Sequence, residues 1–131
     1  MPTSYTLPAL ITLLTVLLQV WMMVIVGRAR AQYGIQPPAT TGNADFERAF
    51  RVQMNTLEST MMFLPALWVF ASFLSTQWAA IVGAAWLLGR AWYAIGYQRE
   101  AAARSKGFLV SIVSVGVLTL GGLYGVLRTL F

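Results

Sequence analysis

The sequence contains no cysteine and no histidine, and it carries only four acidic residues among its 131 positions. The absence of cysteine excludes disulfide bonds and a thiolate nucleophile from the chain itself. The absence of histidine removes the imidazole base and, together with the missing cysteine, the usual ligands of zinc. We therefore expect no metal site, and any thiol chemistry must use a thiol that a bound molecule supplies.

Charge is also scarce. Only 10% of the residues are charged and 58% are hydrophobic, which is too apolar for an ordinary soluble domain of this size. A membrane-spanning helix needs ~20 predominantly apolar residues, and the uncharged segments Leu7–Val26 and Gly107–Leu127 each reach that length. No Lys or Arg precedes Arg28, so the first segment lacks the basic start of a cleaved signal and is expected in the mature protein.

The uncharged interval from Ser59 to Gly89 is broken by the polar triplet Ser75-Thr76-Gln77. Each half is shorter than a full span, so both helices must extend outward past the ends of the interval. This extension draws Asn55, Glu58 and Arg90 to or below the membrane surface. Ionisable groups at that depth usually face the interior of a helix bundle and mark a functional site.

We expect one domain over residues 1–131, with helices at about 6–33, 45–74, 78–97 and 106–128. Pro37-Pro38 should end the first helix, and Asn43 or Asp45 should cap the second. Short connections favour an all-α integral membrane fold, an antiparallel four-helix transmembrane bundle. Gly121 and Gly125 form a small-xxx-small pair that would let another helix approach closely.

The basic residues give a formal net charge of +5 and lie near the ends of the predicted helices, which argues against a nucleic-acid-binding face. The positive-inside rule makes the first and third connections cytoplasmic and puts both termini across the membrane. The rule leaves a bacterial inner membrane and an endoplasmic reticulum both open. The basic residues at the two connections are Arg28, Arg30, Arg48, Arg51, Arg99, Arg104 and Lys106.

Two polar stripes are predicted near this side of the membrane. Arg51, Asn55 and Glu58 are spaced i, i+4 and i+7, so they project from one face of the second helix. A similar spacing puts three residues on one face of the third helix, and further polar residues lie at the same membrane level. These residues are Arg90, Tyr93, Tyr97, Arg30, Arg104 and Ser105.

Arginines and tyrosines at such positions also serve as interface anchors, and this interpretation is favoured for Arg28, Arg99, Lys106 and Arg128. The stripe on the second helix favours a binding site instead. Its cations and single carboxylate suit a small zwitterionic ligand with more carboxylates than amines, because a guanidinium binds a carboxylate in a bidentate fork.

The string Glu47-Arg48-x-x-Arg51-x-Gln53-x-Asn55-x-x-Glu58, followed by Arg90-x-x-Tyr93-x-x-x-Tyr97 and Arg104, resembles the membrane-associated proteins in eicosanoid and glutathione metabolism, the MAPEG family. The resemblance covers nearly the entire chain. It implies a homotrimer of four-helix protomers that holds glutathione between adjacent subunits near the cytoplasmic side of the lipid bilayer.

The resemblance also implies roles. Arg51, Asn55 and Glu58 would bind the carboxylates and the ammonium of glutathione, and Arg104 would stabilise its thiolate. A free thiol has a pKa of ~8.5, and a nearby guanidinium lowers that value, so no general base is required. The residues that would complete the polar pocket are Arg30, Gln53, Arg90, Tyr93, Tyr97 and Ser105.

Two positions depart from the pattern of eicosanoid-forming members. Residue 59 is serine where several of them have tyrosine, and residue 31 is alanine where one has a second consecutive arginine. These departures favour a general glutathione transferase, acting on hydrophobic electrophiles and also reducing lipid hydroperoxides, over an eicosanoid synthase.

Two other functions fit a small four-helix membrane protein. A proton-coupled drug exporter would use the membrane-embedded carboxylate of Glu58, although Arg51 and Asn55 on the same face would keep that carboxylate ionised and repel cationic cargo. A non-catalytic lipid-binding protein needs only an apolar groove, and it has no use for Arg104.

Overall fold

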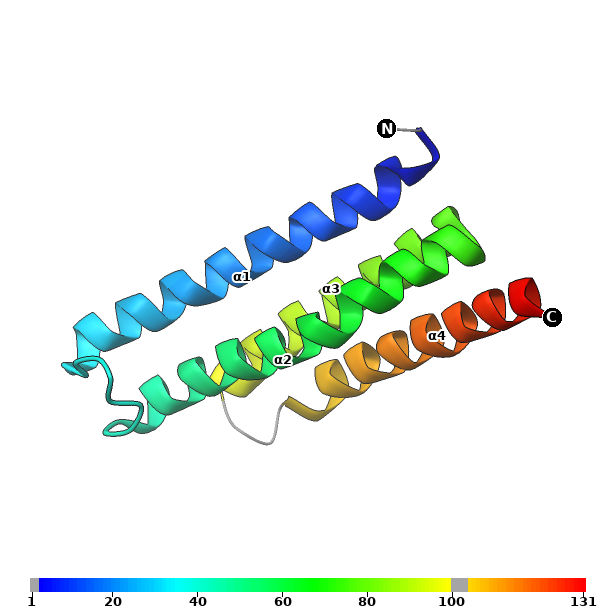
Figure 1. Cartoon of the computed structure of the whole chain (residues 1–131). Coiled ribbons are helices and arrows are strands. Elements are labelled where there is room, and N and C mark those ends of the chain that lie inside the picture. Colours follow the sequence, from blue (N-terminus) through cyan, green and yellow to red (C-terminus); the bar gives the residue numbers. More distant parts are fainter. Residues whose placement is uncertain (1–2, 100–103) are drawn as a thin grey trace.

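The computed structural model describes residues 3–99 and 104–131, and within these residues the fold is an antiparallel bundle of four α-helices (Figure 1). Both termini lie at one end of the bundle, and the connection between the first two helices lies at the other (Figure 1). The helices are α1 (Thr6–Tyr33), α2 (Ala44–Phe73), α3 (Thr76–Arg99) and α4 (Ser105–Leu130), preceded by the 3-10 turn η1 (Thr3–Tyr5). The expected all-helical four-helix fold is confirmed.

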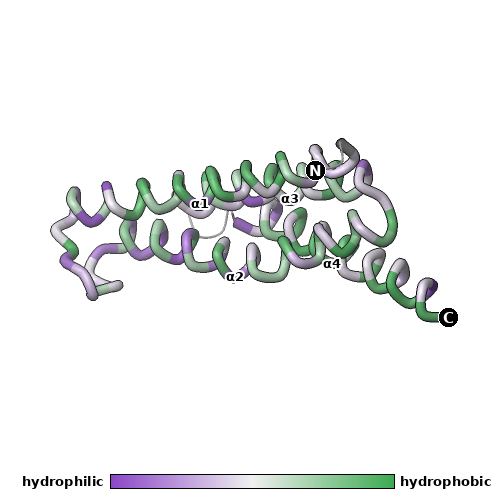
Figure 2. The backbone as a smooth tube through the Cα atoms, turned by 45° about the horizontal axis from the view of Figure 1, so that its top comes forward, coloured by the Kyte–Doolittle hydropathy of each residue, from purple (hydrophilic) through white to green (hydrophobic). Residues whose placement is uncertain are grey.

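All four helices are long and apolar enough to cross a membrane. Hydrophobic residues dominate their length, and hydrophilic residues gather at the end with the α1–α2 connection and along the first half of α2 (Figure 2). Long apolar helices satisfy their backbone groups internally, as a bilayer core requires. The protein is therefore an integral membrane protein with several spans.

Local signals set the helix ends. Gly34, with a φ of 67°, ends α1 in the left-handed conformation, so the helix stops before Pro37-Pro38 rather than at it. The Asn43 side chain caps α2 by accepting from the backbone N–H groups of Asp45 and Phe46, at 2.9 and 3.1 Å. The Ser75 hydroxyl accepts from the backbone N–H of Trp78, which explains why α3 starts at Thr76, earlier than the expected boundary.

Polar contacts tie α1 to α2 within the spans. The Gln19 amide donates to the Thr60 hydroxyl at 2.8 Å, and the Trp68 indole donates to the Thr12 hydroxyl at 3.0 Å. Such interhelical hydrogen bonds support helix association in lipid, where apolar burial gives little drive.

Glycines allow α4 to approach two helices closely. A Cβ added at Gly107 would lie 2.3 Å from the backbone nitrogen of Tyr93, so α3 and α4 cross there with their backbones in contact. A Cβ at Gly121 would lie 2.4 Å from the Phe70 ring, and one at Gly125 would lie 3.0 Å from Phe73, both on α2. The helix that approaches the Gly121–Gly125 pair is therefore α2 of the same protomer.

Gly107→Ala should destabilise the protein, because its Cβ would meet backbone that cannot move aside. We expect a loss of about 1–3 kcal/mol, the usual range for overpacking, seen as a lower thermal unfolding midpoint in detergent. Gly116→Ala on the same helix is the matched control, since nothing lies within 4 Å of its added Cβ. Equal midpoints for the two variants would contradict the backbone crossing.

Candidate functional site

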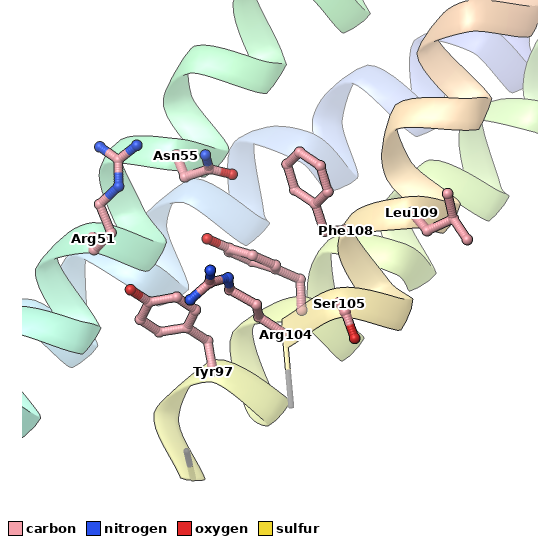
Figure 3. A pocket seen from close by; sticks show the side chains of 8 residues that line it. Arg51, Asn55, Tyr97, Arg104, Ser105, Phe108 and Leu109 are labelled. Atoms are coloured by element: carbon pink, nitrogen blue, oxygen red, sulfur yellow. The ribbon is translucent and has the colours of Figure 1, made fainter. Parts of the chain in front are cut away.

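The main cleft lies between the first half of α2, the end of α3 and the start of α4 (Figure 3). Its volume is about 660 Å³, within the range of small-molecule sites. It brings together six of the residues that the sequence singled out, with two apolar residues of α4 beside them. The lining residues are Arg51, Asn55, Tyr93, Tyr97, Arg104, Ser105, Phe108 and Leu109.

Cationic and phenolic groups dominate the polar side of the main cleft. The Arg104 guanidinium carbon lies 5.5 Å from the centroid of the Tyr97 ring, and Arg104 extends toward Tyr97 in Figure 3. The Ser105 hydroxyl points away from both in the same view. The Tyr93 and Tyr97 rings pack against each other, with centroids 5.6 Å apart. Arginine only donates hydrogen bonds, so this side of the cleft favours an anionic ligand.

Arg51 and Glu58 form an ion pair on the outer face of α2. Arg51 Nη1 lies 3.6 Å from Glu58 Oε1, and the two side chains are 53% and 56% exposed in the protomer. Glu58 does not line the main cleft; it lines a smaller cavity beside it. Both charges stand on a helix that spans the membrane, so they need cover from protein or water.

The smaller cavity has a volume of about 150 Å³ and shares Asn55 and Phe108 with the main cleft. Ser59 lines it, and the Ser59 hydroxyl accepts a hydrogen bond from the Trp86 indole at 3.0 Å. Trp86 in turn stacks on Phe63, with ring centroids 3.9 Å apart. The full lining is Asn55, Glu58, Ser59, Met62, Arg90, Phe108, Ser111 and Ile112.

Arg90 is buried between α2, α3 and α4, with 1% of its surface exposed. Its guanidinium donates to the hydroxyls of Thr56 and Ser111 and to the side-chain oxygen of Asn55. It also lies over the Tyr93 ring, 4.2 Å from the centroid. Arg90 therefore contacts two residues of the main cleft without lining that cleft itself.

Two of the predicted residues lie apart from the cleft within the protomer. Arg30 donates to the backbone oxygens of Ile35 and Ala39, at 3.4 and 2.8 Å, and so fastens the α1–α2 connection. Gln53 is half-buried on α2 and is not among the lining residues of the main cleft. The structure thus separates Arg30 and Gln53 from the group around Arg104.

Sequence reasoning missed Thr56 and Ser111, which supply most of the acceptors for Arg90. It also missed the apolar side of the cleft, Phe108 and Leu109. The sequence did contain a signal for Thr56. This residue lies three positions before Ser59 and four before Thr60, so the three hydroxyls share the buried face of α2. A buried arginine on α3 needs such hydroxyls opposite it.

An apolar groove runs along α2 and α4 beyond the smaller cavity. Its volume is about 530 Å³, and it shares Met62 with that cavity. The groove is lined by side chains that include Pro65, Val69, Leu118 and Leu123. The α2–α4 surface therefore changes from polar at the main cleft to apolar along the groove.

The chain is similar to known proteins over most of its length. The model of the MAPEG family matches residues 8–124. An uncharacterised protein of Synechocystis is 52% identical over 92% of this chain and 88% of its own length. Human microsomal glutathione S-transferase 2 is 35% identical, over 90% of this chain and 80% of its own. Mouse leukotriene C4 synthase is 38% identical, over 92% and 86%.

Within residues 3–99 and 104–131, four helices long enough to span a membrane, with a polar cleft between α2, α3 and α4, define a polytopic membrane protein with a candidate ligand site. Within that class, the family model and these relatives match most of the chain, so the chain belongs to the MAPEG family.

Proposed function

We propose that the protein is an integral membrane glutathione transferase that activates the glutathione thiol for attack on hydrophobic electrophiles. The observation that carries the proposal is the convergence of Arg51, Asn55, Tyr97 and Arg104 on one cleft of about 660 Å³. The relatives microsomal glutathione S-transferase 2 and leukotriene C4 synthase support the same reaction class.

Glutathione has two carboxylates, one ammonium and one thiol. Arg51 and the amide of Asn55 are suitable donors for a carboxylate, and Glu58 is the suitable partner for the ammonium. The 3.6 Å pair between Arg51 and Glu58 places opposite charges side by side, so a zwitterionic end of the ligand can bind to both. In this proposal the phenols of Tyr93 and Tyr97 line the cleft and donate to the remaining ligand oxygens.

Arg104 is the proposed catalytic residue. Its guanidinium stabilises the thiolate, lowers the pKa of the thiol and so raises the fraction of nucleophile at neutral pH. The sulfur lone pair forms a carbon–sulfur bond while the leaving group departs with its bonding electrons, and the thiol proton passes to water. Phe108 and Leu109 on the cleft wall would contact the apolar acceptor, which arrives from the bilayer.

We also propose that residues 1–131 form one domain that assembles as a homotrimer with the site between protomers. The side chains of Arg51 and Glu58 are both more than half exposed on a membrane-spanning helix. In the proposed trimer, a neighbouring protomer covers these two charged groups and shields them from lipid. Because Arg30 and Gln53 do not line the cleft of their own protomer, their proposed contribution comes from the adjacent protomer. The proposed topology keeps the first and third connections cytoplasmic.

The exporter alternative is disfavoured by the same geometry. A transport carboxylate has to bind and release a proton, and it must attract cationic cargo. Glu58 instead lies 3.6 Å from the Arg51 guanidinium, whose positive charge would repel a cationic cargo.

Purified protein in detergent should bind glutathione and conjugate it to a chlorinated nitrobenzene. Binding is measured by calorimetry, and conjugation by the absorbance of the thioether product. A panel of hydrophobic acceptors and lipid hydroperoxides would then define the acceptor class. If the folded protein neither binds glutathione nor forms the product, the proposed function is wrong.

Arg104→Ala and Arg51→Ala should separate turnover from binding. Arg104→Ala removes thiolate stabilisation, so kcat should fall by about 100-fold while the Kd for glutathione stays within a few-fold. Arg51→Ala removes a carboxylate partner, so the Kd should rise about tenfold or more. Arg128→Ala, a basic residue on α4 outside the cleft, is the control. An equal loss of affinity in both cleft variants would contradict this division of roles.

The trimer can be tested by native mass spectrometry of the detergent-solubilised protein. We expect the mass of three chains of 14.4 kDa each. Variants of Arg30 and Gln53 should lose glutathione affinity although neither residue lines the cleft of its own protomer. A monomer that keeps full activity would refute the proposed placement of the site between protomers.

A further inference from the structure

The hydrogen bonds of Arg90 point to a role for this residue that differs from ligand contact. Arg90 Nη2 lies 2.8 Å from Asn55 Oδ1 and 2.8 Å from Thr56 Oγ1, and Arg90 Nη1 lies 3.2 Å from Ser111 Oγ. A further bond joins Arg90 Nε to Thr56 Oγ1 at 3.2 Å. These acceptors are all neutral, and they come from the two helices that flank α3.

We infer that Arg90 is a positioning residue, which fixes the amide of Asn55 with its NH₂ group available to the main cleft. The inference rests on the proposed function, because it assigns the chemistry that Asn55 offers to the carboxylates of glutathione. Arg90 acts through Asn55 and does not touch the ligand.

The direction of the amide follows from hydrogen-bond chemistry. A guanidinium has five N–H donors and no acceptor, so the atom of Asn55 that faces Arg90 must be the oxygen. With its oxygen bonded to Arg90, the half-buried Asn55 side chain offers its two N–H groups to the cleft that it lines. The opposite orientation would present an oxygen to an anionic ligand and repel it.

The burial of Arg90 supports a functional reason for the charge. A buried cation loses its hydration, and an apolar side chain of similar volume often fills such a site without destabilising the protein. The hydrogen bonds of Arg90 all go to the neutral groups of Asn55, Thr56 and Ser111. The Glu58 carboxylate, which lines the same smaller cavity, supplies negative charge without an ion pair to Arg90 within 4 Å. The orientation of Asn55 is a benefit that an apolar side chain would not provide.

The Tyr93 ring is a second neighbour of Arg90, but other contacts hold it too. Its centroid lies 5.6 Å from that of Tyr97 and 6.2 Å from that of Phe108. Tyr93 therefore keeps two aromatic neighbours when Arg90 is replaced. The effect of Arg90 on the ligand should pass mainly through Asn55.

A double-mutant cycle on glutathione affinity tests this route, with Arg90→Met and Asn55→Ala made singly and together. Arg90→Met alone should raise the Kd by about tenfold, the usual effect of losing one hydrogen bond to a charged group. In the Asn55→Ala background, the same change should raise the Kd by less than about twofold, since its partner is already absent. At saturating glutathione, kcat should stay within about twofold, because Arg104 is intact.

An equal effect of Arg90→Met in both backgrounds would overturn the inference and leave the proposed function standing. Failure of the wild-type protein to bind glutathione would instead overturn the proposed function and this role of Arg90 together. Phe63→Leu is the control for general loosening of the bundle. Phe63 is fully buried on α2 and outside the two cavities, so its variant should lower the thermal midpoint without changing the Kd.

Asn55→Asp keeps the inference testable if Arg90→Met does not fold. The aspartate has nearly the same shape and can form an ion pair with Arg90, so the thermal midpoint should not fall. It has no N–H donors and adds negative charge, so the Kd for glutathione should rise at least about tenfold. A variant that binds glutathione as tightly as the wild type would show that the amide N–H groups are not used, and the inference would be wrong.

Discussion

The cost of a charged group inside an apolar medium is the constraint on which the arrangement of this protein depends. A cation within a membrane-spanning bundle must find acceptors from protein, since the bilayer offers none. Arg90 meets this requirement with oxygens of Asn55, Thr56 and Ser111, and so it links the two helices on either side of its own. Asn55 accepts a hydrogen bond from Arg90 and also lines the main cleft, so the contacts of Arg90 help to position the wall of the cleft.

Much of the bundle could be predicted from the sequence, because span length is a property of local composition. The segments Leu7–Val26 and Gly107–Leu127 lie inside α1 and α4. The polar triplet at residues 75–77 marks the turn between α2 and α3, although α3 already includes Thr76. The same polar residues are common in turns and in the first turn of a helix. The sequence therefore predicts the position of the membrane-spanning segments better than the residue at which α3 begins.

The site could be predicted in part, for a similar reason. The spacing of Arg51, Asn55 and Glu58 along α2 is local, and two of these three line the main cleft. The partners of Arg90 depend on how α3 and α4 pack against each other, and the close approach of Gly107 to Tyr93 is part of that packing. Arg30 is expected to complete the polar pocket, but its side chain bonds to the backbone of Ile35 and Ala39 and does not line the cleft.

The chain lacks histidine, the commonest catalytic base, and the cleft is consistent with chemistry that needs no base. A chain without histidine or cysteine cannot supply an imidazole or a thiolate, but it can bind a thiol and stabilise its anion. Arg51 and Arg104 provide positive charge at the cleft, while Glu58, which lies beside the cleft, is paired with Arg51. In the proposed function, the positive charge at the cleft favours the anionic form of the ligand, so binding and activation of the thiol depend on the same electrostatic field.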